Sequence, residues 1–116
     1  MNALICAIVV YNTKIEDSET IKIILQLKER YSLQLKVADN STSPEIIAHN
    51  NQCAKSLGIY YYSMNGNKGL SQAYNIILND IFKEAPDLDD ILIWFDDDTM
   101  INENYFEVLQ RELFKS

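Results

Sequence analysis

The sequence predicts an α/β fold, a three-layer sandwich in which a mostly parallel sheet of about four strands has helices on both faces. Three observations predict it. Short apolar segments alternate along the chain with segments of helical periodicity. The first of them, residues 3–10, is apolar throughout, as in a strand buried on both faces of a parallel sheet. No internal repeat, linker or low-complexity stretch interrupts the alternation, so we expect one domain over residues 1–116.

A helix and a second strand are expected after the first strand. Apolar residues recur at helical spacing over residues 18–31, and Ser18 is a suitable N-terminal cap because its hydroxyl can accept a backbone N–H. The segment "LQLKVAD" that follows is read as a shorter strand, which stops at Asp39.

The next helix has cap signals at both ends. Ser43 can cap its N-terminus, Pro44 suits the first helical position, and Gly58 suits the C-terminal cap. The segment "IYYYSM", residues 59–64, has high β propensity and is read as a strand rather than as an aromatic stacking platform.

The clearest helical periodicity lies in the second half of the chain. Apolar residues from Leu70 to Phe82 recur in steps of three and four, which predicts an amphipathic helix that ends before Pro86. A fourth strand is expected over residues 91–95 and a last helix around residues 105–113. Because strands and helices alternate throughout, we expect a parallel sheet whose strands are joined by right-handed crossovers.

Composition and charge narrow the classes of partner. Lys plus Arg is 10 and Asp plus Glu is 17, and the resulting net charge of −7 disfavours non-specific binding of nucleic acid. No apolar run approaches the roughly 18 residues of a transmembrane helix, and residues 1–10 lack the marks of a signal peptide. Cys6 and Cys53 are expected as free thiols rather than as a disulfide or half of a zinc site. We therefore expect a cytoplasmic location.

Polar residues follow each of the four predicted strands. In an open parallel sheet these strand ends lie along one edge, and ligands bind in the crevice there. Four polar clusters on one edge favour a binding site, although strand ends are also where polar loop residues ordinarily lie. The clusters are Tyr11 to Asn12, Asp39 to Ser41, Asn65 to Gly69 and Asp96 to Asp98.

The acidic triplet after the fourth strand is the strongest candidate for a metal site. Neighbouring carboxylates repel one another, and no Lys or Arg lies within residues 91–102 to offset the repulsion. Alternation along an extended segment directs Asp96 and Asp98 to one side and Asp97 to the other. A few oxygen ligands suit Mg²⁺ or Mn²⁺, whereas the spacing of an EF-hand does not fit. The alternative is a solvated or helix-capping acidic turn.

The loop "NGNKGLS", residues 65–71, is the second candidate. Gly66 and Gly69 permit tight turns or the close approach of a ligand, and Lys68 adds a positive charge at the start of the following helix, where anions bind. The loop lacks the spacing of a Walker A motif and could equally be a plain junction. Asn75, one turn after the loop, could tie it to the helix.

Several other polar residues have both a structural and a functional interpretation. Asp39 could accept the imino N–H of a pyrimidine base, or it could form an Asx turn or cap the helix that begins at Pro44. Tyr11 and Asn12 could form one wall for a base. His49, in mid-helix and without a nucleophile placed beside it, is interpreted as a surface or packing residue.

Four segments of the chain together resemble a known family. In their order and spacing they are similar to the motifs of the family 2 glycosyltransferases, which use nucleotide sugars and have the Rossmann-like GT-A fold. The combination most resembles rhamnosyltransferase-like members and extends from residue 3 to about residue 113. The segments are "AIVVYN", "VADNSTS", "NGNKGLSQAYN" and "IWFDDDT".

The resemblance implies which positions bind nucleotide and metal. Tyr11 and Asn12 would lie beside the nucleobase, and Asp39 would form a hydrogen bond to it. In the family's D-x-D motif the second carboxylate, here Asp98, binds Mn²⁺ or Mg²⁺ on the diphosphate. The first, here Asp96, lies near the ribose and sugar and is the second candidate ligand of the metal. The matching nucleotide-binding positions are Tyr11, Asn12, Asp39, Asn67, Gly69 and Asp96, and Asn75 matches an asparagine of the following helix.

The resemblance also implies an activity. A member of this family would transfer a sugar from a UDP- or dTDP-linked donor to a hydroxyl of a sugar or glycan acceptor, with inversion, at the inner face of the membrane in the synthesis of a cell-surface polysaccharide. Members use a carboxylate base well downstream of D-x-D, and neither Glu103 nor Glu107 matches it. We therefore expect a truncated nucleotide-binding half that is inactive alone and that self-associates through the surface its missing half would cover.

Two other classes of protein stay open. A non-catalytic nucleotide-binding or protein-interaction module would have the same fold with a degenerate site. A flavodoxin- or receiver-like domain with an acidic metal pocket would place acidic residues after its first strand, where this chain has Tyr11 and Asn12. Metal-dependent binding of a nucleotide separates the glycosyltransferase interpretation from both.

Overall fold

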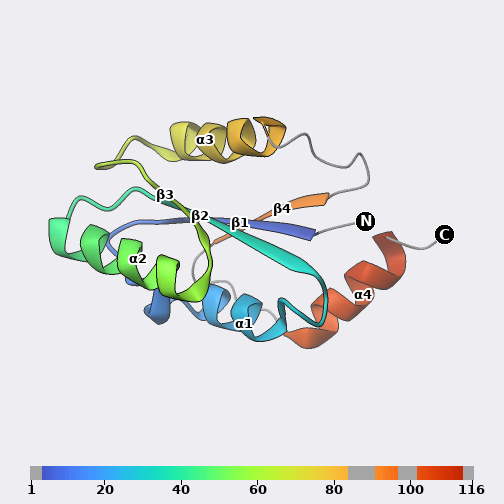
Figure 1. Ribbon diagram of the computed structural model, residues 1–116. Coiled ribbons are helices and arrows are strands. Elements are labelled where there is room, and N and C mark those ends of the chain that lie inside the picture. Colours follow the sequence, from blue (N-terminus) through green and yellow to red (C-terminus); the bar gives the residue numbers. More distant parts are fainter. Residues whose placement is uncertain (1–3, 84–90, 97–101, 114–116) are drawn as a thin grey trace.

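The computed structural model describes residues 4–83, 91–96 and 102–113. Its four strands form one parallel sheet in the order β3-β2-β1-β4, with helices on both faces (Figure 1), so the predicted α/β class is confirmed. The strands are β1 (Leu4–Val10), β2 (Leu33–Asp39), β3 (Tyr60–Ser63) and β4 (Ile91–Phe95). The helices are the 3-10 helix η1 (Ile15–Asp17), α1 (Glu19–Leu27), α2 (Pro44–Leu57), α3 (Leu70–Lys83) and α4 (Glu103–Leu113).

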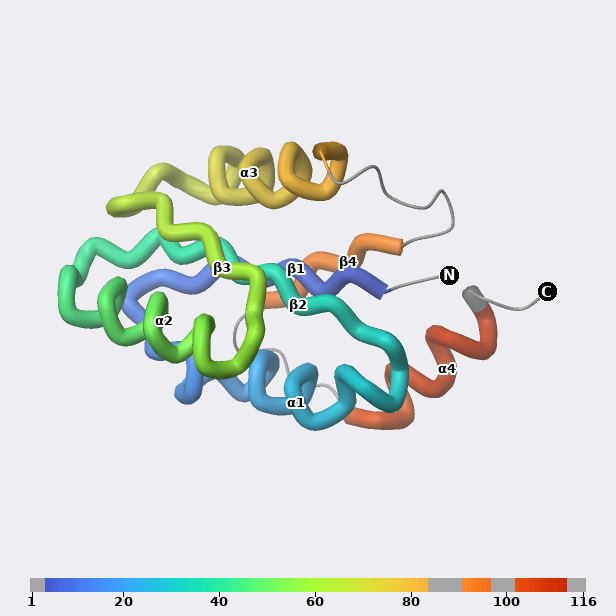
Figure 2. Tube along the Cα trace, viewed as in Figure 1, coloured from blue at the N-terminus to red at the C-terminus, as the bar shows by residue number. Residues whose placement is uncertain are grey.

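The strand order explains why the helices are divided between two faces. The chain moves in one direction from β1 to β2 and β3, and the connecting helices α1 and α2 cover one face of the sheet. It then crosses back to β4 on the far side of β1, and a right-handed crossover in this direction places α3 on the opposite face. Figure 2 traces this path, with α3 above the sheet and α1, α2 and α4 below it.

Strand β1 forms the centre of the core and is almost completely buried, as its uninterrupted apolar sequence predicts. Its side chains alternate between the two faces. Burial of each large aliphatic side chain contributes roughly 1.5–3 kcal/mol, so this strand stabilises both layers. Leu4, Cys6, Ile8 and Val10 belong to the cluster that includes Ile21 and Ile24 of α1, whereas Ile5 and Ala7 belong to the cluster of Ala73, Ile77 and Ile81 of α3.

The cap signals read from the sequence set the ends of two helices. The Ser18 hydroxyl accepts a hydrogen bond from the backbone N–H of Ile21 at 3.2 Å, and Ser43 does the same for Ile46 at 3.4 Å. Gly58, with φ of 70°, ends α2 in the left-handed conformation that glycine adopts without strain.

Helix α1 is shorter than the sequence predicts. Its last helical residue is Leu27, although the periodicity extends to Tyr31. Ser32 has φ of 53°, so the chain reverses there into β2. The Tyr31 ring is buried because it packs against Phe106 of α4, with ring centroids 6.1 Å apart. The apolar spacing at this end of the helix thus reflects packing in a turn rather than a continued helix.

Both cysteines are free thiols, as expected. Cys6 is buried in β1, and burial raises the pKa of its thiol to about 12. Cys53 is partly buried on α2, and burial also raises its pKa. Neither environment favours the reactive thiolate. In the part of the chain that the structure describes, no helix is both long and apolar enough to cross a membrane.

Candidate functional site

The strand order places a reversal of the connections at the carboxyl edge of the sheet. Strand β1 has β2 on one side and β4 on the other, so successive connections diverge from it. In open parallel sheets ligands bind at such a reversal, beyond the carboxyl ends of the strands. Tyr11, which follows β1, and Asp96, which follows β4, lie on the two sides of this reversal.

A pocket of about 390 Å³ lies at this edge, between the end of β1 and the loop before α3. Three of the predicted site residues line it: Tyr11, whose side chain is 52% exposed, Asn67 and Gly69. Val9 of β1 and Leu70, the first residue of α3, add apolar walls. An aromatic ring, amide groups and apolar walls in one concave site suit a flat, polar-edged ligand such as a nucleobase.

The loop before α3 takes a shape that its sequence allows. Asn65, Gly66 and Gly69 have positive φ angles of 57°, 123° and 85°. Any other residue at Gly69 would be strained in this conformation. The Asn67 carboxamide oxygen accepts a hydrogen bond from the backbone N–H of Gly69 at 3.0 Å, which closes a tight turn. The turn places the exposed Lys68 beside the N-terminus of α3, and both attract anions.

Asn40 lines the same pocket, although no separate role was predicted for it. Its amide nitrogen donates to the carbonyl of Gly69 at 3.2 Å, and its carboxamide oxygen accepts from the N–H of Lys68 at 3.3 Å. Its own backbone N–H donates to the carbonyl of Val10 at 2.9 Å. Asn40 therefore links the ends of β1 and β2 to the loop. The sequence showed only that Asn40 directly follows a strand. It did not show that this strand end lies beside the loop before α3, because that depends on the order of the strands in the sheet.

Asn12 supports the loop after β2 and does not line the pocket. Its backbone has φ of 48°, and its backbone N–H donates to the Ser41 hydroxyl at 2.8 Å. Its carboxamide oxygen accepts from the N–H groups of Thr42 at 2.9 Å and of Ser43 at 3.1 Å. In this structure the Asn12 side chain thus organises the approach to α2, one residue away from the Tyr11 that faces the pocket.

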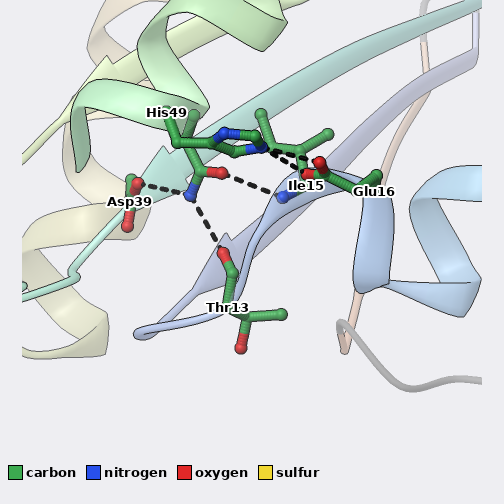
Figure 3. A network of polar contacts seen from close by, with 6 residues as sticks. Thr13, Ile15, Glu16, Asp39 and His49 are labelled. Atoms are coloured by element: carbon green, nitrogen blue, oxygen red, sulfur yellow. Dashed lines mark hydrogen bonds and ion pairs between the residues drawn. The ribbon is translucent and has the colours of Figure 1, made fainter. Parts of the chain in front are cut away.

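Asp39 is fully buried at the end of β2, and protein groups bind both of its carboxylate oxygens. One oxygen accepts from the N–H of Ser41 at 2.9 Å. The other accepts from the amide of Asn50 at 3.0 Å and from the hydroxyl of Tyr61 at 2.6 Å. Figure 3 shows Asp39 at one end of a network of polar contacts. The residue has no exposed surface. The structural interpretation of Asp39, as an Asx-type turn, is therefore realised.

The network continues from Asp39 to the segment after β1. The Asn50 amide donates to the carbonyl of Thr13 at 2.9 Å and accepts from the N–H of Ile15 at 2.9 Å (Figure 3). These bonds hold the 3-10 helix η1, which the sequence did not predict. Burial, and in second place the hydrogen bond to Asp39, raise the pKa of Tyr61 well above its ordinary value, so the phenol stays protonated.

The exposed edge of the same region carries the only histidine. His49 Nε2 lies 2.7–2.8 Å from both carboxylate oxygens of Glu16 (Figure 3). A backbone hydrogen bond, and to a lesser extent His49, lower the pKa of the Glu16 carboxyl. His49 is thus a surface residue, as interpreted from the sequence. Asn75 is exposed on α3, and Asn40 rather than Asn75 holds the pocket loop.

Asp96 is exposed directly after β4. Its backbone carbonyl accepts a hydrogen bond from the Thr20 hydroxyl at 2.7 Å, which ties the end of β4 to α1. Asp97 and Asp98 lie outside the described residues. Within residues 4–83, 91–96 and 102–113, no group of three or more His, Cys, Asp or Glu side chains could hold a metal. Asp96 offers one exposed carboxylate at the carboxyl edge of the sheet. Mg²⁺ and Mn²⁺ take one or two carboxylates and complete their coordination with water and phosphate.

A second charged cluster lies between the sheet and α3. Lys36 of β2 is fully buried, and its ammonium lies 3.3 Å from the Asp80 carboxylate and 3.9 Å from the centroid of the Tyr60 ring. The Tyr62 hydroxyl forms a hydrogen bond to the same Asp80 oxygen. That hydrogen bond, and then Lys36, lower the pKa of the Asp80 carboxyl. The cluster fastens α3 to β2 and β3.

Comparisons with protein-family models, with curated proteins and with solved structures found no significant match to this chain.

Proposed function

We propose that this chain binds a nucleoside-diphosphate sugar, UDP- or dTDP-linked, together with Mn²⁺ or Mg²⁺, and supplies the donor-binding part of an inverting glycosyltransferase. The observation that carries the proposal is the pocket at the carboxyl edge of the sheet, between the end of β1 and the loop before α3, because it brings together Tyr11, Asn67 and Gly69 from distant segments. The setting would be the cytoplasm, at the inner face of the membrane, with a sugar or glycan as the acceptor.

The pocket offers different chemistry to different parts of the donor. The Tyr11 ring and the apolar groups of Val9 and Leu70 suit the nucleobase. The exposed Lys68 and the first turn of α3 suit the diphosphate, since the N–H groups at a helix N-terminus and a lysine ammonium both favour phosphate. Asp39 would act indirectly, by supporting the loop that follows β2, because its carboxylate is buried and bound by protein donors.

Asp96, and Asp98 beyond the described residues, are the residues we propose to hold the metal. When bound, the ion would offset negative charge on the nucleoside diphosphate as it leaves. We assign no catalytic base to this chain, so we propose donor binding without sugar transfer by the chain alone. Sugar transfer by the purified chain, measured as release of free nucleoside diphosphate with an acceptor panel, would contradict that assignment.

Titration calorimetry with UDP, dTDP and GDP, each with and without Mn²⁺, tests the proposal. We expect one of the three to bind, and the affinity to fall when Mn²⁺ is withdrawn. Asp98→Ala should abolish the metal dependence, whereas Asp97→Ala and the exposed control Asp17→Ala should keep it. Binding that ignores Mn²⁺ would favour a non-catalytic nucleotide-binding module, and failure to bind any of the three would reject the nucleotide site.

Self-association is a separate proposal, and it rests on the edge of the sheet. Among the described strands β4 pairs with β1 alone, and its Trp94 is 37% exposed beside Tyr74 of α3, with ring centroids 4.3 Å apart. An edge strand with exposed apolar side chains is a surface on which chains associate. Sedimentation velocity over a concentration series should show a growing dimer fraction, and a purely monomeric profile would contradict the expectation.

A further inference from the structure

The contacts of Asn40 suggest more than a place in the pocket wall. The residue is only 3% exposed, and both polar atoms of its side chain are bound to the backbone of the loop. Its amide donates to the carbonyl of Gly69 and its oxygen accepts from the N–H of Lys68. This two-point pairing resembles the pairing between neighbouring strands, and it leaves the side chain little surface with which to contact a ligand itself.

The loop that Asn40 holds is also the wall that the ligand would contact. Gly69 and Asn67 line the pocket, and the carbonyl of Gly69 that Asn40 contacts also accepts the hydrogen bond from Ala73 in the first turn of α3. A displacement of this carbonyl would therefore move the pocket wall and the start of α3 together. The glycine backbone, with φ of 85°, offers little resistance to such a displacement.

We propose that Asn40 is a positioning residue of the nucleotide site, which sets the affinity for a nucleoside diphosphate by fixing the loop of residues 65–69 against the ends of β1 and β2. The inference rests on the proposed nucleotide binding. Asn40 would act through the backbone of this loop, whereas the neighbouring Asp39 belongs to a separate buried network.

The first measurement concerns the loop alone, without a ligand. Amide hydrogen exchange is followed by NMR in the wild-type chain, in Asn40→Ala and in the matched control Asn51→Ala, which alters an exposed asparagine of α2. We expect the N–H of Lys68 to exchange roughly tenfold faster in Asn40→Ala, because its acceptor is removed, and to be unchanged in the control. Unchanged exchange at Lys68 in Asn40→Ala would overturn the positioning role.

The second measurement is the affinity for UDP with Mn²⁺, or for whichever nucleotide the wild type prefers. We expect Asn40→Ala to weaken binding roughly tenfold, as the loss of two loop hydrogen bonds implies, with Asn51→Ala unchanged. Gly69→Ala attacks the same loop from its own backbone and should weaken binding similarly, which keeps the test valid if Asn40→Ala folds poorly. If Asn40 had a purely structural role, its replacement would not be coupled to Gly69→Ala in its effect on nucleotide affinity.

The double variant shows whether Asn40 and Gly69 affect nucleotide binding through the same loop or independently. If both residues act on one loop, Asn40→Ala combined with Gly69→Ala should bind little worse than either single variant, whereas independent effects would multiply. Multiplied effects, or an unchanged affinity in Asn40→Ala, would overturn the inference. A wild-type chain that binds no nucleotide would instead remove the proposed function and the ligand role of Asn40 with it, while the exchange at Lys68 would still show whether Asn40 holds the loop.

Discussion

Two groups of polar residues lie at the carboxyl edge of the sheet, and the protein uses them in opposite ways. Around the end of β2, the groups of Asp39 and Asn50 are buried and bound to other protein groups. Around the end of β1 and the loop before α3, Tyr11 and Asn67 are exposed and face a pocket. Asn40 lies between the two groups and is connected to the second.

The difference shows that polar residues after a strand have to be sorted by where their hydrogen bonds go. A buried polar group bound by protein partners contributes to stability, and its removal leaves those partners unsatisfied. An exposed polar group in a concave site costs little to remove and is available to a ligand. Variants in the two regions should therefore separate stability from binding.

The largest effect is expected for Asp39→Ala. The change leaves the N–H of Ser41, the amide of Asn50 and the hydroxyl of Tyr61 without their acceptor, so the free energy of unfolding should fall by about 3 kcal/mol or more. Urea denaturation measures it. The exposed Asp17→Ala should change stability by less than about 0.5 kcal/mol. Similar small effects for both variants would remove the distinction between the two regions.

Tyr11→Ala should have the reverse profile. Its ring is half exposed, so the free energy of unfolding should change by less than about 0.5 kcal/mol. Loss of the pocket wall should weaken nucleotide binding roughly tenfold, about 1.4 kcal/mol. Phe82→Ala is the matched control, because this aromatic residue of α3 is 71% exposed and does not line the pocket. An equal fall in affinity in both variants would mean that the pocket is not where the nucleotide binds.

Tyr61→Phe sharpens the comparison within the buried region. Loss of one hydrogen bond to Asp39 should lower the free energy of unfolding by about 1 kcal/mol at neutral pH. The raised pKa of Tyr61 adds a pH dependence. The phenol ionises at about pH 10 in the unfolded chain but at higher pH in the folded one, so its contribution is complete below about pH 10 and is lost as the pH rises further. The variant should show a shallower alkaline loss of stability, and an identical slope would argue against a buried, protonated Tyr61.

The smallest effect is expected for the exposed contact between His49 and Glu16, which Figure 3 shows. His49→Ala breaks the contact with Glu16, but the two side chains are 40% and 50% exposed, so the cost should be no more than about 0.5 kcal/mol after solvent screening. Glu16→Ala should give the same small value. Thermal unfolding at low and high salt provides the measurement, and a loss comparable to that of Asp39→Ala would mean that burial does not rank the contacts of this network.

Local signals explain why most of the fold could be predicted. The caps at Ser43 and Gly58 lie within or beside the helix they bound, and α2 spans residues 44–57 as they indicate. The steps of three and four between Leu70 and Phe82 correspond to α3 almost residue for residue. The same kind of spacing predicted too long a helix α1, as far as Tyr31. Tyr31 is buried because it packs against Phe106 of α4, which lies far along the chain.

Part of the candidate site could also be predicted from local signals. Tyr11, Asn67 and Gly69 belong to segments whose strand ends identify them, and the structure brings them into one pocket. The side chains of Asp39 and Asn40 form hydrogen bonds to partners up to 29 residues away, which no local pattern reports. The burial of Lys36 was equally hidden, since its partner Asp80 lies 44 residues further along and on another element.

We propose that nucleotide and metal bind at the carboxyl edge of the sheet, over the pocket and Asp96, and leave the buried network of Asp39 undisturbed. Paramagnetic broadening of amide resonances by Mn²⁺ in the presence of UDP, with Mg²⁺ as the diamagnetic reference, tests it most directly. We predict broadening at Tyr11, Gly69 and Asp96, with sharp resonances at Leu57, at the other end of α2. Uniform broadening, or broadening that spares Tyr11, Gly69 and Asp96, would contradict binding at this edge of the sheet.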